Sequence, residues 1–595
     1  MINLDKELPG AYYRVVFWLV VALAAVLRIY HLDFESLFVD EIRQVSCYPY
    51  ELSKIFSCAV YQQHPPLDFW IGHIVALFSY TDFSVRLPAA IFGTASVGMV
   101  MSIARPVSGQ IWALWAGLMF AILPFHIHYS QEARPYALAI FLFLVVLRVL
   151  LWISDAKEVQ LKHYLLLFLA SILFLLTRAL SPLVSMFAIG VVFFMFWLYS
   201  IRQYGLLRTT SQRTYVSQMA IFIAAAVSYL PVLQVIISKS GRYLSTEEAR
   251  SVYEWVSQLV SEGAQSVFLV WVAQSEPIGY LLVVGFIFAI LALLSGKMHH
   301  PFGIKLVLIL PVAIVTMIVI YYAKTSYPLR PPYMIFVLPL ALLSSAIGFS
   351  SISKLFSPRM QRLLVLVVMG LSVLWIVPSL IEFKDSRKKS DWRNVVHLLE
   401  KKYPDHVVVF DHLASYGGWK AQFYGFQRYS RQALPLFDMR RVKTADFMDE
   451  LKAPPVLVLH HFTGISLTPD SRYPVHRTYD PDPEWDNRIV SDDFVSDRLH
   501  GFWVVSMANP SGDFMVDLKR LLEETVLRLP ASPSLLDSWF AYMAVSLGSG
   551  CQLPQEFYTR LLENVPEHDK QNKIELLESV RGYYHNIGLN KACNQ

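Results

Sequence analysis

Apolar residues are clumped along this chain into runs long enough to cross a lipid bilayer. A helix of about 20 apolar residues spans the roughly 30 Å hydrocarbon core of a membrane. The chain has eleven such runs, at about 14–30, 86–104, 111–125, 136–153, 164–178, 180–200, 217–237, 278–296, 304–323, 333–350 and 362–382. The run at 164–178 is short, which suits a tilted, broken or partly inserted helix. The pattern predicts a polytopic α-helical membrane domain over residues 1–382.

The composition changes after Ile381, where the charged segment FKDSRKKSDWRNVV begins. Strand-like runs HVVVF, PVLVLH and FWVVSM then alternate with helix-like or turn-rich stretches, which is typical of an α/β layer. The segment MVDLKRLLEETVLRL carries apolar residues at helical spacing. We therefore predict an α/β domain over 383–510 and a helical part over 511–595, both outside the membrane.

Charge supports the same division of the chain. Hydrophobic residues make up 55% of the sequence and charged residues 16%, whereas soluble proteins are about one quarter charged. The net charge of +5 comes largely from the short loops between apolar runs. We therefore predict no nucleic-acid partner.

Lysine and arginine in the short loops predict the orientation, because such loops remain on the cytoplasmic side. The first run lacks a small-residue cleavage site and is interpreted as an anchor, not a removable signal peptide. The predicted cytoplasmic residues are Lys6, Arg14, Arg105, Lys157, Lys162, Arg202, Arg208, Arg213, Lys297, Lys305, Lys354, Arg359 and Arg362. The amino terminus is then cytoplasmic, and the carboxyl-terminal domain is periplasmic or otherwise extracytoplasmic.

The four cysteines form two plausible pairs on the outer side. Cys47 and Cys58 share the first outside loop, residues 31–85, and Cys551 and Cys593 share the terminal helical part. Disulfides form in oxidising compartments. Spacing alone does not fix connectivity, so each pair fits either a disulfide or two free thiols.

Adjacent acids, Asp40 and Glu41, follow the first apolar run in the segment SLFVDEIRQ. Carboxylates at a membrane surface cost free energy when buried, so they often serve a function there. A carboxylate acts as a general base when it reaches the proton and has a suitable pKa. Taken alone, the dipeptide also fits a solvated loop.

Three further motifs place polar residues on the same outer side. In QHPPLDFW, two prolines stiffen the backbone beside His64. A rigid backbone there would suit a His64 that binds phosphate or donates a proton, and it also fits a plain turn at the start of a helix. SVRLPAA places Arg86 at the start of the second run, and HYSQEARPYAL places Glu132 and Arg134 before the fourth.

Two more arginines interrupt the apolar pattern. Arg178 separates two runs, and Arg330 precedes two prolines and Tyr333. The planar guanidinium makes paired hydrogen bonds to phosphate. A single arginine at the interface also fits snorkelling to lipid, but several on one side are better explained by an anionic ligand. The long loop 238–277 contains amphipathic SVYEWVSQLV and fits either an interfacial lid or a plain connection.

The motifs LFVDE, QHPPLDFW, SVRLPAAIFG and HYSQEARPYAL occur in the order and spacing of a known family. The chain resembles the protein O-mannosyltransferase and aminoarabinose-transferase superfamily, which are membrane-embedded glycosyltransferases of the C type (GT-C). The resemblance is strong over about 1–180 and weaker through 382. The carboxyl-terminal domain matches only in its placement. One departure is FLLTRALSP, where relatives carry a more polar stretch, so two roles remain open for Arg178: phosphate binding or the end of the span.

The resemblance implies an inverting transfer of a sugar from a polyprenyl monophosphate at the outer leaflet. Asp40 would activate the acceptor, and Glu41 completes the acidic pair. Arg330 and Arg134 are favoured for the leaving phosphate, ahead of Arg86 and Arg178. His64 is expected to shape the same pocket, with Glu132 and Tyr333 assigned to it as well.

Cofactor, sugar and acceptor are less defined. Some relatives hold a divalent ion near the acidic loop, but no spaced ligand cluster in this sequence fixes a metal, and no other cofactor is implied. The acceptor is lipid A, lipopolysaccharide core, another glycan or a protein, and the resemblance places the chain in a bacterial inner membrane. The sugar is a pentose, hexose, aminosugar or uronic acid.

Other functions fit parts of the pattern. A transporter or lipid flippase would also have many helices, but transporters often show inverted halves, and none is visible here. A non-catalytic envelope scaffold would use the outer domain and would not need the Asp40 loop. A polymer ligase with a diphosphate-linked donor would lack the early DE and HPPL elements.

Overall fold

The computed structural model describes residues 9–156, 158–206, 209–239, 276–295, 301–323, 335–385, 391–410, 426, 428–431, 436–438, 453–460, 494–499 and 502–528. The chain forms two compact units. One comprises Met1–Phe34 with Gln44–Ser386, and the other comprises Glu35–Arg43 with Arg387–Gln595. The segment around Asp40, which the sequence placed in the first loop of the membrane domain, thus clusters with the second unit.

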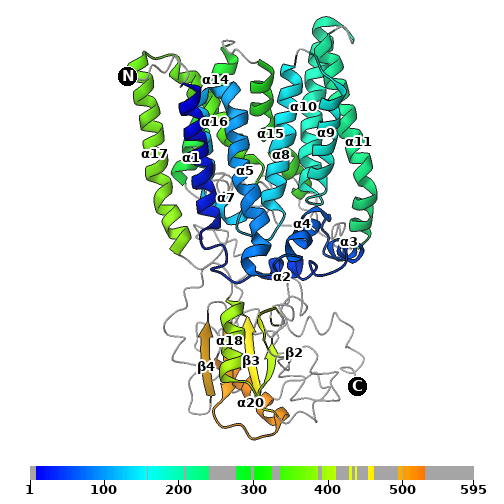
Figure 1. Ribbon diagram of the computed structural model, residues 1–595, viewed down its shortest axis with the longest axis vertical. Coiled ribbons are helices and arrows are strands. Elements are labelled where there is room, and N and C mark those ends of the chain that lie inside the picture. Colours follow the sequence, from blue (N-terminus) through cyan, green and yellow to red (C-terminus); the bar gives the residue numbers. More distant parts are fainter. Residues whose placement is uncertain are drawn as a thin grey trace. The chain divides into compact units, whose positions relative to one another are not determined.

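The first unit is a bundle of long helices (Figure 1). Each of the eleven predicted runs coincides with one helix, so the predicted polytopic helical fold is confirmed. These helices are α1 (Gly10–Ile29), α5 (Asp82–Ser108), α6 (Gln110–Ile122), α8 (Tyr136–Asp155), α9 (Leu161–Leu175), α10 (Ser181–Tyr204), α11 (Thr210–Lys239), α14 (Glu276–Leu294), α15 (Pro301–Ala323), α16 (Val337–Ser353) and α17 (Pro358–Asp385). Within the described residues, 7 helices are long and apolar enough to span a membrane, by length and composition.

Shorter helices accompany the long ones. In the first unit they are α3 (Leu52–Tyr61), α4 (Leu67–Ala76) and α7 (Pro124–Tyr129), and α2 (Val39–Val45) contains the boundary between the two units in the sequence. The predicted short run at 164–178 is helix α9, which has 15 residues. A helix of that length rises about 22 Å, so it is shorter than the hydrocarbon core is thick.

Local sequence sets where the long helices begin and end. Thr81 and Ser84 form a reciprocal capping box at the start of α5, which satisfies backbone N–H groups that have no partner inside the helix. Gly109 ends α5 with φ +83°, a left-handed conformation that glycine adopts at little cost. The chain then turns directly into α6.

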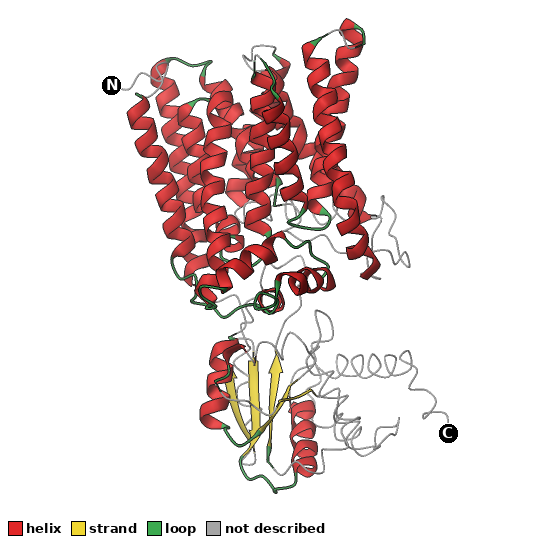
Figure 2. Cartoon of the chain, turned by 45° about the vertical axis from the view of Figure 1, so that its right-hand side comes forward, coloured by secondary structure: helices red, strands yellow, loops and turns green. Residues whose placement is uncertain are grey.

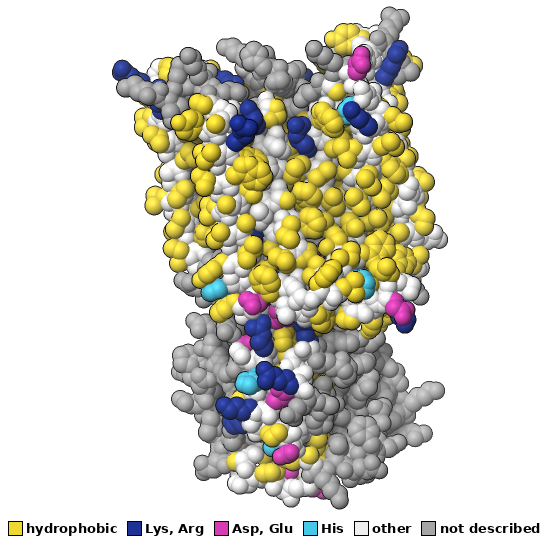
Figure 3. Space-filling view, viewed as in Figure 1, with side chains coloured by type: hydrophobic (Ala, Val, Ile, Leu, Met, Phe, Trp, Pro, Cys, Tyr) yellow, Lys and Arg dark blue, Asp and Glu magenta, His cyan; other side chains and the backbone are white. Residues whose placement is uncertain are grey.

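Burial separates inner from outer helices. In the most apolar window of α8, 72% of the residues are buried, whereas the corresponding share is 17% in α1 and in α17. Figure 3 shows hydrophobic side chains covering the visible face of the bundle in a broad band, with lysines and arginines gathered at the end where α1 begins. This surface is suited to lipid, as the hydrophobic pattern predicted.

Helices α14 and α16 cross at very short range. A Cβ added at Gly348 would lie 1.8 Å from the carbonyl oxygen of Gly285, and one added at Gly285 would lie 2.6 Å from Cβ of Ser345. Small residues permit this approach because backbones then pack directly on one another. The hydroxyl of Ser345 also donates a hydrogen bond of 2.8 Å to the carbonyl of Leu282.

The second unit contains a five-stranded sheet (Figure 2). Its strands are β1 (Val407–Phe410), β2 (Leu436–Asp438), β3 (Pro455–His460), β4 (Phe494–Leu499) and β5 (Phe502–Met507), in the order β2-β1-β3-β5-β4. The pairs of β1 with β2 and β3 are parallel, and the pairs of β5 with β3 and β4 are antiparallel. Three strands lie where the sequence predicted strands.

Among the described residues of the second unit, two helices accompany this sheet: α18 (Trp392–Lys402) and α20 (Phe514–Arg528). Strand β1 is buried along its whole length, as an inner strand of a covered sheet should be. Helix α20 packs on β3 and β5 and buries Leu518, Leu521 and Leu522. These are the apolar positions whose helical spacing the sequence showed.

Candidate functional site

The acidic pair lies in the first turn of helix α2. The Glu41 side chain is buried, and its Oε2 accepts a hydrogen bond of 2.8 Å from the backbone N–H of Phe38, the residue just before the helix. This is the contact by which a glutamate at the third helical position caps a helix. Asp40 is half-buried. The two acids therefore have different surroundings, although they are adjacent in sequence.

The segment that precedes α2 is held by the second unit, to which it belongs. The hydroxyl of Ser36 accepts a hydrogen bond of 3.0 Å from the backbone N–H of Arg393 and donates one of 3.4 Å to Asp391. The backbone N–H of Leu37 donates to the Tyr429 hydroxyl at 2.8 Å. Asp391 is also the N-cap residue of α18. The first residues of α18 and Tyr429 thus fix the backbone three residues before Asp40.

A buried polar cluster lies in the first unit around Gln44, one helical turn after Asp40 on α2. The Gln44 amide nitrogen hydrogen-bonds the Asp68 carboxylate and donates to the Tyr48 hydroxyl at 2.9 Å. Its amide oxygen accepts from Nη1 of Arg134 at 3.3 Å. Nη2 of Arg134 lies 3.2 Å from Nε2 of His64. We call these five residues the Gln44 cluster.

The cluster combines a cation and an acid in a buried place. Arg134 and Asp68 are each only 9% exposed. Burial raises the pKa of the Asp68 carboxyl from 3.8 to about 6, against the opposing effects of the Gln44 hydrogen bond and the Arg134 charge. A carboxyl with such a pKa changes protonation near neutral pH, which is frequent at functional sites.

The sequence predicted two members of this cluster and missed three. His64 and Arg134 came from motifs, and the structure brings them together. Asp68 lies within QHPPLDFW, and an acid in a short apolar helix is a feature of the sequence that could have identified it as a member of the cluster. Gln44 follows Asp40 by four residues, which is the helical spacing for one face, but nothing in the sequence marked Gln44 or Tyr48 as its partners.

The other predicted residues of the described chain have contacts of their own. Oε1 of Glu132 lies 3.2 Å from Nε2 of His128. Nη1 of Arg86 donates to the carbonyl of Leu32 at 3.0 Å, just after α1. The Arg178 guanidinium carbon lies 4.4 Å from the ring centroid of Tyr136, which is a cation–π contact. All three charged side chains are buried.

Several expectations fall elsewhere. Arg330, Tyr333 and nearly all of the loop 238–277 lie outside the described residues, as does the Cys551–Cys593 pair. Cys47 and Cys58 form a disulfide, which joins the end of the α2 segment to α3. Among the described residues, no group of three or more His, Cys, Asp or Glu side chains is placed to hold a metal ion.

Comparison with known proteins reveals a likeness in structure but not in sequence. No family model and no curated protein matches the chain. The crystal structure of ArnT from Cupriavidus metallidurans bound to undecaprenyl phosphate matches with a TM-score of 0.50 and 14% identity, over 85% of this chain and 99% of that one. Its apo structure matches with a TM-score of 0.50 and 14% identity, over 84% and 98%.

A likeness at this identity shows the fold. The chain has a GT-C fold similar to that of ArnT, and the agreement extends over nearly the whole length of the ArnT chain. The fold expected from the four sequence motifs is therefore confirmed.

Proposed function

We propose that this chain is an inverting membrane glycosyltransferase that moves a sugar from a polyprenyl monophosphate to an acceptor at the outer face of the membrane. The observation that carries the proposal is the Gln44 cluster, where Arg134 and His64 meet one helical turn from Asp40 along α2. The GT-C fold supports it, as does the undecaprenyl phosphate bound to ArnT.

Arg134 is proposed to bind the phosphate of the donor. Arginine has five N–H donors in one plane, and the contacts to Gln44 and His64 fix the orientation of that plane. Positive charge placed beforehand stabilises the charge that develops on a leaving phosphate as its bond to the sugar breaks. Arg330, with Arg86 and Arg178, stays a predicted contributor to the same charge.

Asp40 is proposed as the general base. It would accept the proton of an acceptor hydroxyl while that oxygen attacks the anomeric carbon, and the bonding electrons of the sugar–phosphate bond would leave with the phosphate. A single displacement attacks from the face opposite the leaving group, so configuration inverts. The Glu41 carboxylate accepts a hydrogen bond from the backbone N–H of Phe38, so we assign to Glu41 the role of stabilising the start of α2.

The proposed location rests on two features at opposite ends of the bundle. The Cys47–Cys58 disulfide favours an oxidising compartment on the side of α2 and α3. Lysines and arginines gather at the other end, which the positive-inside rule assigns to the cytoplasm. A bacterial inner membrane with the second unit outside fits both features. A divalent cation beside Asp40 and Glu41 stays a prediction from the resemblance.

The proposal is tested by separating transfer from donor binding. Cells that produce wild type or Asp40→Asn are compared by mass spectrometry of envelope lipids and glycans, which reports the sugar and the acceptor together. We expect Asp40→Asn to lose the added sugar mass and, once purified, to retain undecaprenyl phosphate. Arg134→Gln should weaken that binding by roughly 10- to 100-fold, since a charged hydrogen bond contributes about 1.5–3 kcal/mol.

The matched control is Asp33→Asn. The Asp33 carboxyl is exposed and lies between α1 and α2, in the segment that leads to Asp40. Unchanged products in a well-folded Asp40→Asn protein would exclude Asp40 as the base. Unchanged lipid binding by Arg134→Gln would exclude Arg134 from the phosphate site.

A further inference from the structure

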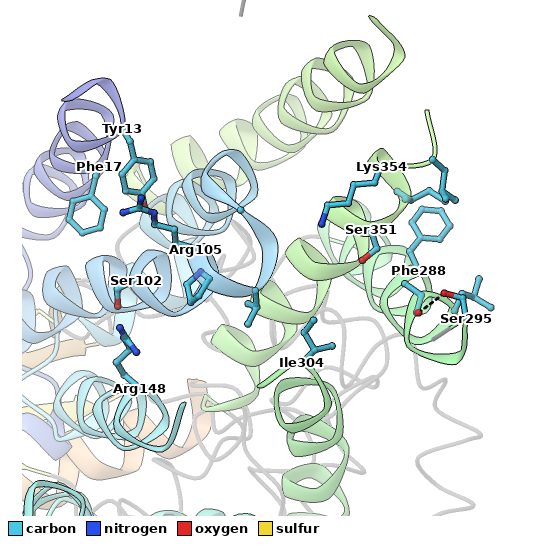
Figure 4. Close-up of a pocket in the computed structure, with 17 residues that line it drawn as sticks. Tyr13, Phe17, Ser102, Arg105, Arg148, Phe288, Ser295, Ile304, Ser351 and Lys354 are labelled. Carbon is cyan, nitrogen blue, oxygen red and sulfur yellow. Dashed lines mark hydrogen bonds between the residues drawn. The ribbon is translucent and has the colours of Figure 1, made fainter. Parts of the chain in front are cut away.

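A cavity opens at the end of the bundle opposite to the Gln44 cluster. Its volume is about 1220 Å³, and it is lined by the ends of α1, α5, α8, α14, α15 and α16 (Figure 4). Helix α5 connects the two ends: Arg86 lies in its first turns and Arg105 in its last turn. These positions are 19 residues apart, which is roughly 28 Å along a helix. The cavity is therefore distinct from the proposed catalytic site.

Three cations line this cavity and no acid does, among its described lining residues. They are Arg105 on α5, Arg148 on α8 and Lys354 directly after α16. The Arg105 guanidinium stacks on Tyr13 of α1, with its carbon 4.7 Å from the ring centroid. Figure 4 shows the Lys354 amine extending from α16 toward the α5 side. Three positively charged side chains thus line one space, which favours an anionic occupant.

Arg105 and Lys354 have an ordinary explanation, because cations are favoured at helix carboxyl ends and in cytoplasmic loops. Arg148 does not. It lies seven residues before the end of α8, about 10 Å inside the bundle. Its side chain is half-buried, and within the described part of the chain no hydrogen bond or ion pair of its guanidinium is found. A charge at such depth costs free energy unless something compensates it.

Apart from three serines, most of the remaining lining is apolar. Phe17, Phe288, Leu291 and Ile304 contribute hydrocarbon beside the cations. Leu291 is 57% exposed and Leu355 at the rim is 68% exposed, so the cavity continues into the apolar exterior of the bundle. A soluble anion would leave this surface uncovered, whereas a lipid would cover it with its chains and place its headgroup among the cations.

We propose that this cavity binds an anionic phospholipid, with the headgroup phosphate held by Arg148, Arg105 and Lys354 and the chains against the apolar lining. The lipid comes from the membrane leaflet on the side where α1 begins. The site is separate from the proposed donor site and does not depend on glycosyl transfer. Arg148 is its central residue, since the phosphate supplies the compensating charge.

The test uses the purified full-length chain in detergent and native mass spectrometry with added dioleoyl phosphatidylglycerol or dioleoyl phosphatidylcholine. We expect phosphatidylglycerol to be retained preferentially. Arg148→Gln should lower its apparent affinity about tenfold, as expected for the loss of a charged hydrogen bond. Lys354→Gln, on an exposed side chain at the rim, should lower it less and with little risk to folding.

Arg202→Gln is the matched control: Arg202 is exposed in the last turn of α10 at the same end of the bundle, outside the cavity lining. It should leave retention unchanged. Equal loss in Arg148→Gln and Arg202→Gln would show only general surface attraction and would overturn the proposal, as would equal retention of both lipids.

A second arm distinguishes a lipid from a soluble phosphate ester. The probe is sn-glycerol 3-phosphate, which carries the phosphate without the chains. We expect it neither to displace phosphatidylglycerol nor to raise the melting temperature. If it stabilises wild type but not Arg148→Gln, the phosphate site holds and its occupant is soluble. If neither probe distinguishes wild type from Arg148→Gln, the site does not exist.

Discussion

Asp68 should make the stability of this protein depend on pH in a way that one substitution removes. Its carboxyl is buried against Gln44 and near Arg134, and burial raises its pKa from 3.8 to about 6. The unfolded chain therefore releases this proton about two pH units earlier than the folded chain. Asp68→Asn preserves an oxygen that accepts from Gln44 and has no proton to release.

The sign and size follow from linkage. Between pH 3.8 and about 6 the unfolded state loses the proton while the folded state retains it, so the free energy of unfolding falls as pH rises. The contribution of the Asp68 carboxyl to the free energy of unfolding is fully present below pH 3.8 and is lost above about pH 6. Each pKa unit corresponds to about 1.4 kcal/mol, so the full effect is about 3 kcal/mol.

The assay compares thermal unfolding of wild type and Asp68→Asn in detergent at one heating rate between pH 4.5 and 7.5. We expect the melting temperature of Asp68→Asn to rise steadily relative to that of wild type as pH rises to about 6. Above that pH the difference in melting temperature should stay constant. Asp33→Asn, which changes an exposed carboxyl, is the control and should show no such trend. A difference that stays flat over this range would refute the buried position of Asp68 and the cluster built around it.

Two further predictions test packing and the division of roles on α2. Gly348→Ala should lower the melting temperature, at a cost of about 1–3 kcal/mol, because the new Cβ would lie 1.8 Å from the Gly285 carbonyl oxygen and force α14 and α16 apart. Gly370→Ala in α17 meets nothing within 4 Å and should be tolerated, so equal melting temperatures would contradict the helix crossing. Glu41→Gln retains an oxygen for the Phe38 N–H and should preserve most of the transfer activity, whereas Glu41→Ala loses a cap contact that contributes about 0.5–2 kcal/mol to stability. A loss in Glu41→Gln as deep as in Asp40→Asn, measured by mass spectrometry of the envelope, would instead assign catalysis to the Glu41 charge.

The membrane helices could be predicted from the sequence because each one is a local property of the chain. A run of about 20 apolar residues must satisfy its backbone hydrogen bonds within itself when it lies in lipid, so the run and the helix coincide. The same holds for buried strands such as β1, whose four residues are all apolar. His64 and Arg134 could also be predicted from the sequence. The prolines next to His64 and the position of Arg134 beside a membrane span can each be recognised within one short segment.

The partners of these residues were decided by tertiary structure. Gln44 meets Asp68 and Arg134 because α2, α4 and the turn before α8 pack together, and no short-range rule encodes that meeting. Ser36 and Leu37 form hydrogen bonds with residues more than 350 positions later in the chain, which places the segment before Asp40 in the second unit. In the sequence, Arg148 is a single charged residue within an apolar run. The cavity that it lines is formed only when the ends of several helices pack together. Hydrophobic pattern specifies what each segment becomes, whereas the contacts of buried polar groups depend on which segments meet, and those contacts define the sites.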